Sequence, residues 1–191
     1  ANPLGDIFIP RGNSSGIYRC ASNIILTNAS GKNFQGNILS DGATIKFVTT
    51  GSSSDTDAAQ QKGFVAYPVT NGSGGDTSGW SQDSGKAIMR GLVISGPRNG
   101  ASVYLANSIG FTIEHCRFTA ARYGIVAECT IGATLFKNKF YDHYNAAVGW
   151  IYANNASVYY SSGFWNDSYM MMNNSFAAGP TAGCMAFIID H

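Results

Sequence analysis

The chain has 191 residues, which is enough for a single domain with a continuous hydrophobic core. Charged residues make up 12% and hydrophobic residues 45%, and the net charge is +1. This composition excludes a disordered chain. The sequence also lacks the excess of Lys and Arg that is typical of nucleic-acid-binding proteins. No run of about 18 apolar residues occurs, so no membrane insertion is expected.

The first third of the chain contains short β-branched and aromatic segments separated by Gly, Asn and Ser. Such segments favour strands, which we predict over residues 6–12, 16–19, 23–26 and 42–47. Residues 49–86 are rich in Gly, Ser and Asp around one predicted strand, Phe64 to Val69. We expect this stretch to be an excursion from the regular fold, where function is often found.

From residue 89 onward the sequence repeats in register. Four segments (89–94, 113–118, 135–140 and 171–176) each begin and end with an apolar residue, at shifts of 24, 22 and 36 residues. The last shift is one repeat plus a lateral loop at 153–167. The fourth position of each segment is predicted to point inward, and stacked amides there should bond along the axis. It holds Leu92, Cys116, Asn138 and Asn174.

A second series follows each segment after a four-residue turn. It covers residues 99–103, 123–127, 145–149 and 181–185, each with a small residue near its start. Alternation and a spacing of about 4.8 Å between stacked strands predict columns of inward side chains. The predicted columns contain Ala101, Val103 and Leu105; Ile125, Ala127 and Cys129; Ala147, Gly149 and Ile151; and Gly183, Met185 and Phe187.

The period and the residue types together predict the fold class. Alternating apolar positions and Gly or Asn punctuation favour strands over helices. A repeat of about 22–24 residues is typical of a solenoid. We therefore predict an all-β chain, a single-stranded right-handed parallel β-helix, that forms one domain over 1–191.

Three segments resemble pectate-lyase-like β-helices. Residues 7–18, with Pro10, Gly12 and Tyr18, resemble the opening rung, and Asp41-Gly42-Ala43-Thr44-Ile45 resembles the rung that follows. Residues 111–125 resemble the later rungs. The resemblance spans most of the chain and specifies architecture strongly. It specifies chemistry weakly, since lyases, hydrolases, epimerases and binding proteins share these motifs.

Within that family the chain looks most like a phage tailspike depolymerase. The resemblance implies a homotrimer on an extracellular virion tail that binds and cleaves bacterial capsule or O-antigen by carboxylate acid/base hydrolysis during host cell recognition. A non-catalytic glycan-binding spike or adhesin, a polysaccharide lyase and a structural solenoid are the alternatives. The family's entry helix is absent before Ala1, and a strand-like run reaches Ile189, so we expect a longer polypeptide or ends covered by partner chains.

The outward positions of the second series suggest a sugar-binding site. We expect Tyr104, Glu128 and Trp150 to stack on successive rungs, with the carboxylate between two aromatic rings. Aromatic faces pack on sugars, and apolar neighbours would raise the pKa of Glu128 for proton donation. An interface with another subunit is the alternative. Because hydrolysis usually takes two carboxylates, Asp142 and Asp167 are further catalytic candidates.

Further substrate contacts are expected at the turn before the second series and in the lateral loop. Arg98, Arg122 and Tyr144 should stack there, beside His143. Two like charges favour a bound anion, such as a uronate-containing polysaccharide, or a salt bridge with Glu114 or Asp142. The aromatic-rich loop at 153–167, with Trp165, suits either a glycan groove or core packing.

No metal site or cofactor is expected. Cys20, Cys116, Cys129 and Cys184 have neither CxxC nor zinc-ligand spacing, so we predict packed free thiols, with a Cys116–Cys129 contact as the alternative. Phosphate-binding loops and Asp-rich calcium loops are absent, which argues against a calcium-dependent pectate lyase. Residues 170–172, three methionines, are interpreted as core filler.

Overall fold

The computed structural model describes residues 5–12, 16–26, 36–48, 62–66, 87–106, 110–128, 130, 132–150, 169–177 and 185–189. All regular structure in these ranges is β-strand. Among the described residues, no helix is long and apolar enough to cross a membrane.

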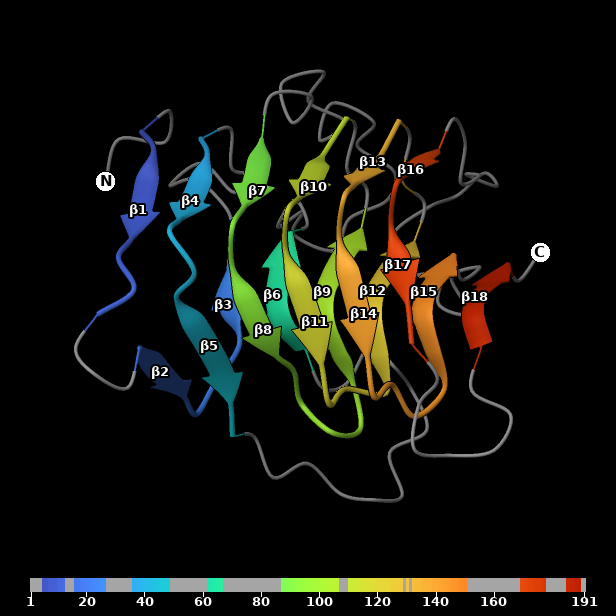
Figure 1. Ribbon diagram of the computed structural model, residues 1–191, viewed down its shortest axis with the longest axis horizontal. Helices are drawn as coiled ribbons and strands as arrows, with labels where there is room; N and C mark the ends of the chain where they lie inside the picture. Colours follow the sequence, from blue (N-terminus) through green and yellow to red (C-terminus); the bar gives the residue numbers. More distant parts are fainter. Residues whose placement is uncertain are drawn as a thin grey trace, which may run out of the picture.

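The strands form three parallel sheets of six strands each, and the chain visits sheets A, B and C in turn before starting again (Figure 1). This architecture is compatible with a parallel β-helix. Below, three successive strands, one from each sheet, are called a strand set. Sheet A contains β1 (Ile7–Ile9), β4 (Ile38–Ser40), β7 (Ile88–Arg90), β10 (Thr112–Glu114), β13 (Thr134–Phe136) and β16 (Met170–Met172).

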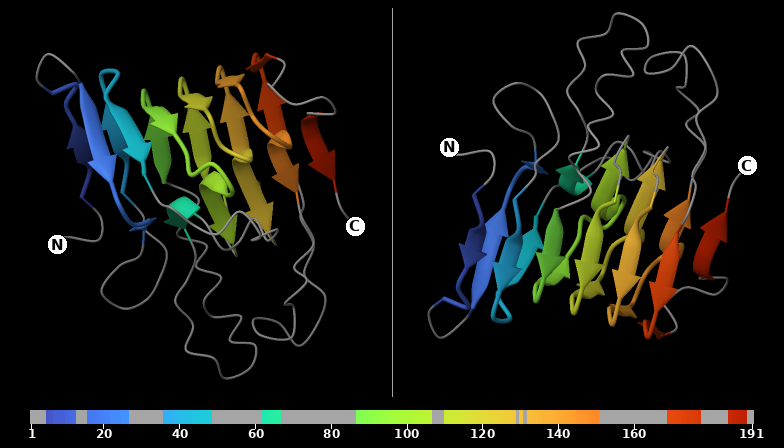
Figure 2. Two further views of the ribbon diagram at one scale, coloured as in Figure 1. Left: turned by 90° about the horizontal axis from the view of Figure 1, so that it is seen from below. Right: turned by 90° about the horizontal axis from the view of Figure 1, so that it is seen from above.

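The other two sheets run beside sheet A with the same order along the axis (Figure 2). Sheet B contains β2 (Ile17–Cys20), β5 (Thr44–Phe47), β8 (Val93–Ser95), β11 (Arg117–Thr119), β14 (Lys139–Tyr141) and β17 (Ser175–Phe176). Sheet C contains β3 (Ile24–Ile25), β6 (Lys62–Ala66), β9 (Ala101–Ala106), β12 (Tyr123–Glu128), β15 (Ala146–Trp150) and β18 (Met185–Ile189).

The register of sheets A and B confirms the first predicted series. Ile113 pairs with Met89 on one side and Leu135 on the other, and Leu135 pairs with Met171. The last positions of the segments pair in the same way in sheet B, and their side chains are buried except at the final strand. They are Ile94, Phe118, Phe140 and Phe176.

Each segment of that series is divided into two strands by a residue with positive φ. Gly91 has φ 79°, and His115, Lys137 and Asn173 have φ 54°, 53° and 54°. This left-handed residue interrupts the alternation of side chains, because it turns the chain between sheets A and B. The next residue therefore points inward, as predicted for the fourth position.

Two of those inward residues form the predicted amide ladder. Asn138 is fully buried; its side-chain oxygen accepts a hydrogen bond from Cys116 N (3.0 Å), and its Nδ2 donates to Ile113 O (2.8 Å). Asn174 repeats the pattern one strand set later, accepting from Asn138 N and donating to Leu135 O, both at 2.8 Å. The ladder satisfies backbone groups that the bend leaves unpaired.

Sheet C departs from the predicted register at both pairings of β12. Ile125 pairs with Val103, at a shift of 22 residues instead of the predicted 24. On the other side it pairs with Val148, at a shift of 23 instead of the predicted 22. The cause of this second difference is the connection before β15 (residues 142–145), which is one residue longer than the connection before β12 (120–122). Because a slip of one residue exchanges the two faces of a strand, Val148 and Trp150 point inward. The prediction of Gly149 as an inward residue is wrong.

The core between sheets B and C combines large rings with small residues. The Phe118 and Phe140 rings stack with centroids 5.0 Å apart, and Phe140 and Phe176 do so at 5.1 Å. A Cβ added to Gly124 would lie 2.8 Å from the Phe140 ring and 2.6 Å from Ala147 O. Gly124, near the start of β12, therefore makes room for the Phe140 ring of sheet B.

In the first third, the strands predicted near β1, β2, β3 and β5 are confirmed, and β4 was not predicted. The strand predicted at 64–69 begins earlier, as β6, and pairs with β3 and β9 in sheet C. That part of 49–86 belongs to the sheets rather than to an excursion. Residues 49–61, 67–86 and 151–168, which include the rest of the excursion and the lateral loop, lie outside the described ranges.

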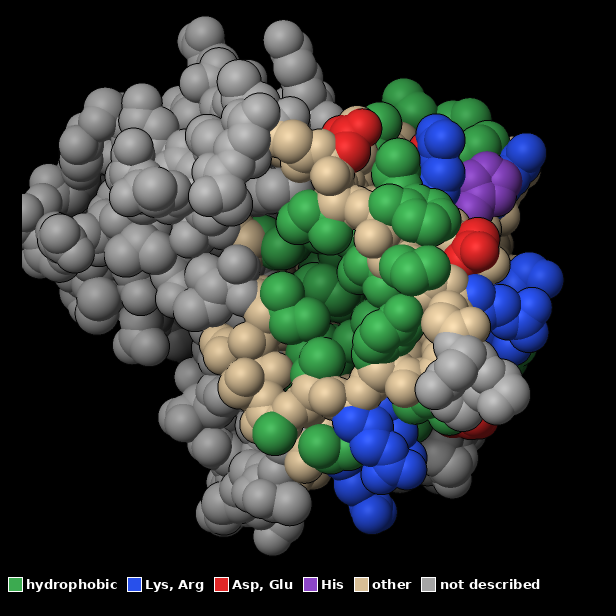
Figure 3. Space-filling model, turned by 90° about the vertical axis from the view of Figure 1, so that its left-hand side faces the viewer, with side chains coloured by type: hydrophobic (Ala, Val, Ile, Leu, Met, Phe, Trp, Pro, Cys, Tyr) green, Lys and Arg blue, Asp and Glu red, His purple; other side chains and the backbone are tan. Residues whose placement is uncertain are grey.

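Apolar side chains are exposed on the first and last strands. At the end formed by β1 and β2, hydrophobic side chains fill the centre of the surface (Figure 3), and Phe8 is 60% exposed. At the other end Phe187 is 53% exposed. Of the three methionines predicted as core filler, Met171 packs on the core, while Met170 and Met172 are exposed, so the prediction is confirmed only for Met171.

Candidate functional site

The predicted column of Tyr104, Glu128 and Trp150 is not formed. Tyr104 pairs with Val126, Glu128 pairs with Ala106, and Trp150 pairs with Ala127. The same difference in connection length explains the error at Trp150. The side chain of Glu128 lies outside the described part of the chain, so its role as proton donor stays a prediction.

Neither aromatic residue of that column is presented to solvent. Trp150 is 6% exposed and points into the core, where its ring lies 4.9 Å from Tyr169 and 6.4 Å from Phe187. Tyr104 points outward as predicted, but it is also 6% exposed and packs with Tyr123 and Val126. The prediction that these rings form an exposed sugar platform is therefore wrong.

The carboxylate candidates are far apart in the fold. Asp142 is exposed, with φ 53°, and it opens the connection between β14 and β15. Glu128 ends β12, roughly 16 Å along the strand from the corresponding connection at 120–122. This separation exceeds the spacing of a hydrolytic carboxylate pair within one chain. Asp167 and Trp165 lie outside the described residues.

The turn between sheets B and C contains the predicted cations and Tyr144. The Arg98 guanidinium carbon lies 5.3 Å from the Tyr144 ring centroid, which brings these two residues together as predicted. Arg122 lies 5.6 Å from the ring of its neighbour Tyr123. Such cation–π contacts hold an arginine in place against an aromatic ring. The predicted alternative was a salt bridge from these arginines to Glu114 or Asp142. For Glu114 this prediction is wrong, because its carboxylate pairs with Arg90.

His143 is buried beneath this turn. It is 2% exposed, its Nδ1 lies 3.3 Å from Ala121 O, and its ring packs 6.0 Å from that of Phe140. Burial lowers the pKa of His143 to about 4, against smaller opposing effects that include the charge of Asp142. The structure therefore places His143 as a neutral, packed imidazole beneath the turn, and its predicted contact with substrate stays a prediction.

The outer face of sheet B has a consistent positive charge. Its six strands contain four basic residues and no Asp or Glu. The four side chains are exposed, and they form two cross-strand pairs, Arg19 with Lys46 and Arg117 with Lys139. From β2 to β14 these cations span about 19 Å along the axis. We call these four residues the basic face.

Such pairing of like charges is unfavourable without a ligand. Two cations about 5 Å apart repel each other by about 1 kcal/mol in water, and like charges on opposite positions of neighbouring strands destabilise a sheet. Arg117 is held by the Tyr141 ring, whose centroid lies 5.1 Å from its guanidinium carbon. A ligand with negative charge would remove the repulsion.

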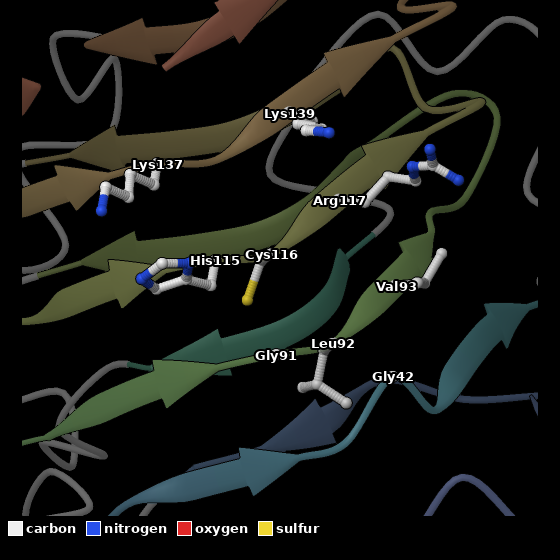
Figure 4. Close-up of a pocket in the computed structure, with 9 residues that line it drawn as sticks. All are labelled: Gly42, Gly91, Leu92, Val93, His115, Cys116, Arg117, Lys137 and Lys139. Carbon is white, nitrogen blue, oxygen red and sulfur yellow. The ribbon is translucent and has the colours of Figure 1, made fainter. Parts of the chain in front are cut away.

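A groove of about 320 Å³ lies beside the basic face, at the bend between sheets A and B (Figure 4). Figure 4 shows that side chains project from both sides of the bend, with His115 and Lys137 toward sheet A and Arg117 and Lys139 toward sheet B. All four are exposed. The remaining lining residues are Gly42, Gly91, Leu92, Val93 and Cys116. We call this site the bend groove.

The lining residues of the bend groove include no acid. The carboxylate of Glu114, next to His115 in sequence, is engaged by Arg90, whose Nε donates to Glu114 Oε1 at 2.6 Å. Exposed Asp41 is adjacent to Gly42, at the opposite end of the groove from Lys137 and Lys139. The potential is therefore most positive at the end formed by His115 and the two lysines.

The cysteine that lines the groove is not a nucleophile. Cys116 is a free thiol, 2% exposed, with its sulfur 3.4 Å from Glu114 O and 3.7 Å from Met89 O. Burial raises its pKa to about 12. A thiol with that pKa stays protonated and unreactive near neutral pH. The predicted packed free thiol is confirmed for Cys116.

The sequence contained one signal for this site that was not used. Arg117 and Lys139 occupy the same position of two aligned segments, 22 residues apart, as do His115 and Lys137. Basic residues at corresponding positions of consecutive repeats must lie side by side in a solenoid. The predicted sugar-binding column came from the second series, which forms sheet C, and the cations of sheet B were not among the predicted contacts.

Comparisons with protein-family models, with curated proteins and with solved structures found no match. Within the described ranges, no group of three or more His, Cys, Asp or Glu side chains could hold a metal ion.

Proposed function

We propose that this chain is a right-handed parallel β-helix, with coils of about 22–24 residues, that binds an acidic bacterial surface polysaccharide along the basic face. One observation carries the proposal: the strands of sheet B present four exposed cations and no acid, although the whole chain has a net charge of only +1. The strands of sheet B therefore present positive charge without an acid of their own to balance it.

The shape of the basic face suits a linear ligand. Its two cation pairs lie at different positions along the axis, with the uncharged strand β8 between them. A polyanionic chain lying along the axis would meet Arg19 and Lys46 first and Arg117 and Lys139 further on.

The resemblance to tailspikes supplies the biological setting of the proposal. In that setting the protein is a homotrimer at an extracellular virion tail, and binding of polysaccharide is host cell recognition. Light scattering of the full chain tests the trimer directly, with a mass of three chains as the expected result. A monomer mass would contradict the proposed assembly without affecting the basic face.

Binding is tested by biolayer interferometry on immobilised bacterial polysaccharides, acidic and neutral. Lys139→Glu and Lys46→Glu are expected to weaken binding to an acidic polysaccharide by about tenfold or more each, because each replaces attraction by repulsion. Both side chains are exposed, so the variants should fold.

Arg11→Glu is the matched control, since it makes the same change of charge at an exposed residue outside sheet B. It is expected to retain most of the affinity. Equal losses in all three variants would show that only net charge matters, and would contradict a binding site on the basic face.

Cleavage of the polysaccharide is the second candidate, favoured by the exposure of Asp142 beside the Arg98–Tyr144 pair. Incubation with polysaccharide should then produce new reducing ends, without ultraviolet absorbance for a hydrolase and with it for a lyase. Because Asp142 and Glu128 are too far apart to act as a pair within one chain, Asp142→Asn and Glu128→Gln are tested separately, and loss of the catalytic carboxylate should abolish turnover and spare binding. Unchanged turnover in either variant would remove that residue from the mechanism.

A further inference from the structure

We infer that the bend groove binds a phosphate group carried on a sugar, so that the acidic groups of the bound polysaccharide are phosphate esters rather than uronates. This inference rests on the proposed function, because it names the anion that one part of the bound chain supplies. It adds a site, since His115 and Lys137 lie outside the strands of sheet B.

The charge of the groove matches an anion with more than one negative charge. Arg117, Lys137 and Lys139 contribute three full positive charges, and His115 adds an imidazole N–H donor. A carboxylate offers one negative charge, whereas a phosphate ester offers about two near neutral pH and three acceptor oxygens.

The four side chains line one groove because they come from two successive strand sets. Arg117 and Lys139 pair across sheet B, and His115 and Lys137 follow the paired residues Glu114 and Phe136 in sheet A. Figure 4 shows His115 and Lys137 on one side of the bend and Arg117 and Lys139 on the other, so donors flank the groove on both sides. A phosphate monoester has three acceptor oxygens, which can accept from donors on both sides.

The aromatic rings near the groove favour a sugar over a nucleic acid. The Lys137 ammonium lies 4.9 Å from the Phe136 ring centroid, and the His115 ring packs edge-on to the same ring at 5.8 Å. Phe136 and Tyr141 are thus already in contact with basic side chains, whereas nucleic-acid binding normally needs free rings for base stacking. Val93 offers an apolar contact at the Gly42 end, of a size that suits the C–H face of a sugar.

The test is a titration of the full chain, followed by backbone amide chemical shifts at constant ionic strength. The probes are glucose 6-phosphate, inorganic phosphate, glucuronate and glucose. Glucose 6-phosphate is expected to bind most tightly and to shift residues 115–117 and 137–139, with glucuronate at least about tenfold weaker. Glucuronate binding as tight as glucose 6-phosphate would overturn the choice of phosphate, and inorganic phosphate binding as tight would overturn the choice of a sugar ester.

The variants are chosen so that the bend keeps its conformation. Lys137→Asn and His115→Asn place asparagine where φ is positive, which asparagine tolerates and which Asn173 already does one strand set later. Lys137→Asn should weaken glucose 6-phosphate binding by about tenfold. Arg11→Asn, at an exposed residue outside both the basic face and the groove, should not change it. Unchanged affinity in Lys137→Asn would overturn the assignment of the site.

Failure of this inference can be told apart from failure of the proposed function. If Lys46→Glu abolishes polysaccharide binding but no phosphate probe binds, the inference is wrong and the basic face stands. If glucose 6-phosphate binds in the groove but no acidic polysaccharide is retained, the proposed function is wrong and the groove stands as a phosphate site. Tighter binding of a single-stranded oligonucleotide than of any phosphorylated glycan would overturn the assignment to a glycan.

Discussion

Single buried polar residues hold the bend between sheets A and B in shape. Asn138 makes two hydrogen bonds through its side chain, to Cys116 N and Ile113 O, and both backbone groups lie in the core. Without the amide, these groups would be buried and unpaired, which costs about 1–3 kcal/mol each. The conformation of the bend groove, which lies on the outer side of this bend, depends on this residue.

We expect Asn138→Leu to lower the free energy of unfolding by about 2–4 kcal/mol, because the shape is nearly kept while two hydrogen bonds are lost. Urea denaturation followed by circular dichroism measures the loss. Asn174→Leu is the comparison, since Asn174 makes equivalent bonds but is only partly buried. A smaller loss is expected there, and an equal loss in both variants would contradict the dependence on burial.

His143 should make stability depend on pH. Its pKa is lowered from 6.5 to about 4 in the folded chain, so the unfolded chain binds the proton more readily between these values. Stability is then fully present above about pH 6.5 and is lost as the pH falls toward 4, by up to about 3 kcal/mol.

This pH dependence is measured by urea denaturation at intervals from pH 7 to pH 4. His143→Gln should flatten the part of the profile that His143 contributes. A wild-type profile with the same slope as that of His143→Gln would contradict the assignment.

At the scale of elements, the sequence was sufficient to predict the register of the strands wherever the connections between them keep the same length. The positions of Met89, Ile113 and Leu135 fixed the register of sheets A and B, because the bends between these sheets are equally long in the later sets. The position of Trp150 could not be obtained in the same way. One additional residue in 142–145 reverses the faces of β15, and no local residue pattern marks such an insertion.

The stack of Phe118, Phe140 and Phe176 is the element-scale feature most open to measurement. Phe140 is 1% exposed with a ring on either side, whereas Phe176 is 38% exposed with one. Phe140→Ala is expected to cost about 3–5 kcal/mol of unfolding free energy, as for other buried rings.

Phe176→Ala should cost clearly less, because less apolar surface is lost and no enclosed cavity forms. Both values come from the same urea titrations. Similar losses of unfolding free energy at the two positions would show that the last strand is as tightly packed as the middle of the stack. That result would contradict the different exposed fractions of Phe140 and Phe176.

At the scale of the whole molecule, charge and apolar surface are separated. Exposed apolar side chains belong mainly to the first and last strands, and the cations of sheet B lie along the side between them. The sequence repeat predicted the stacking of strands that forms the outer face of sheet B. It did not predict which of the three faces would be functional, because burial of Tyr104 and Tyr123 on sheet C depends on tertiary packing rather than on alternation.

Recognition of polysaccharide through charge is tested most directly by comparing one acidic polysaccharide with its own charge-neutralised form. A polysaccharide bound by the wild-type chain is treated to remove its acidic groups, and both forms are measured by biolayer interferometry at the same ionic strength. We expect the neutral form to bind at least about tenfold more weakly, with Lys46→Glu and Lys139→Glu reducing only the binding of the acidic form. Equal binding of the two forms by the wild-type chain would contradict a basic face that recognises polysaccharide through charge.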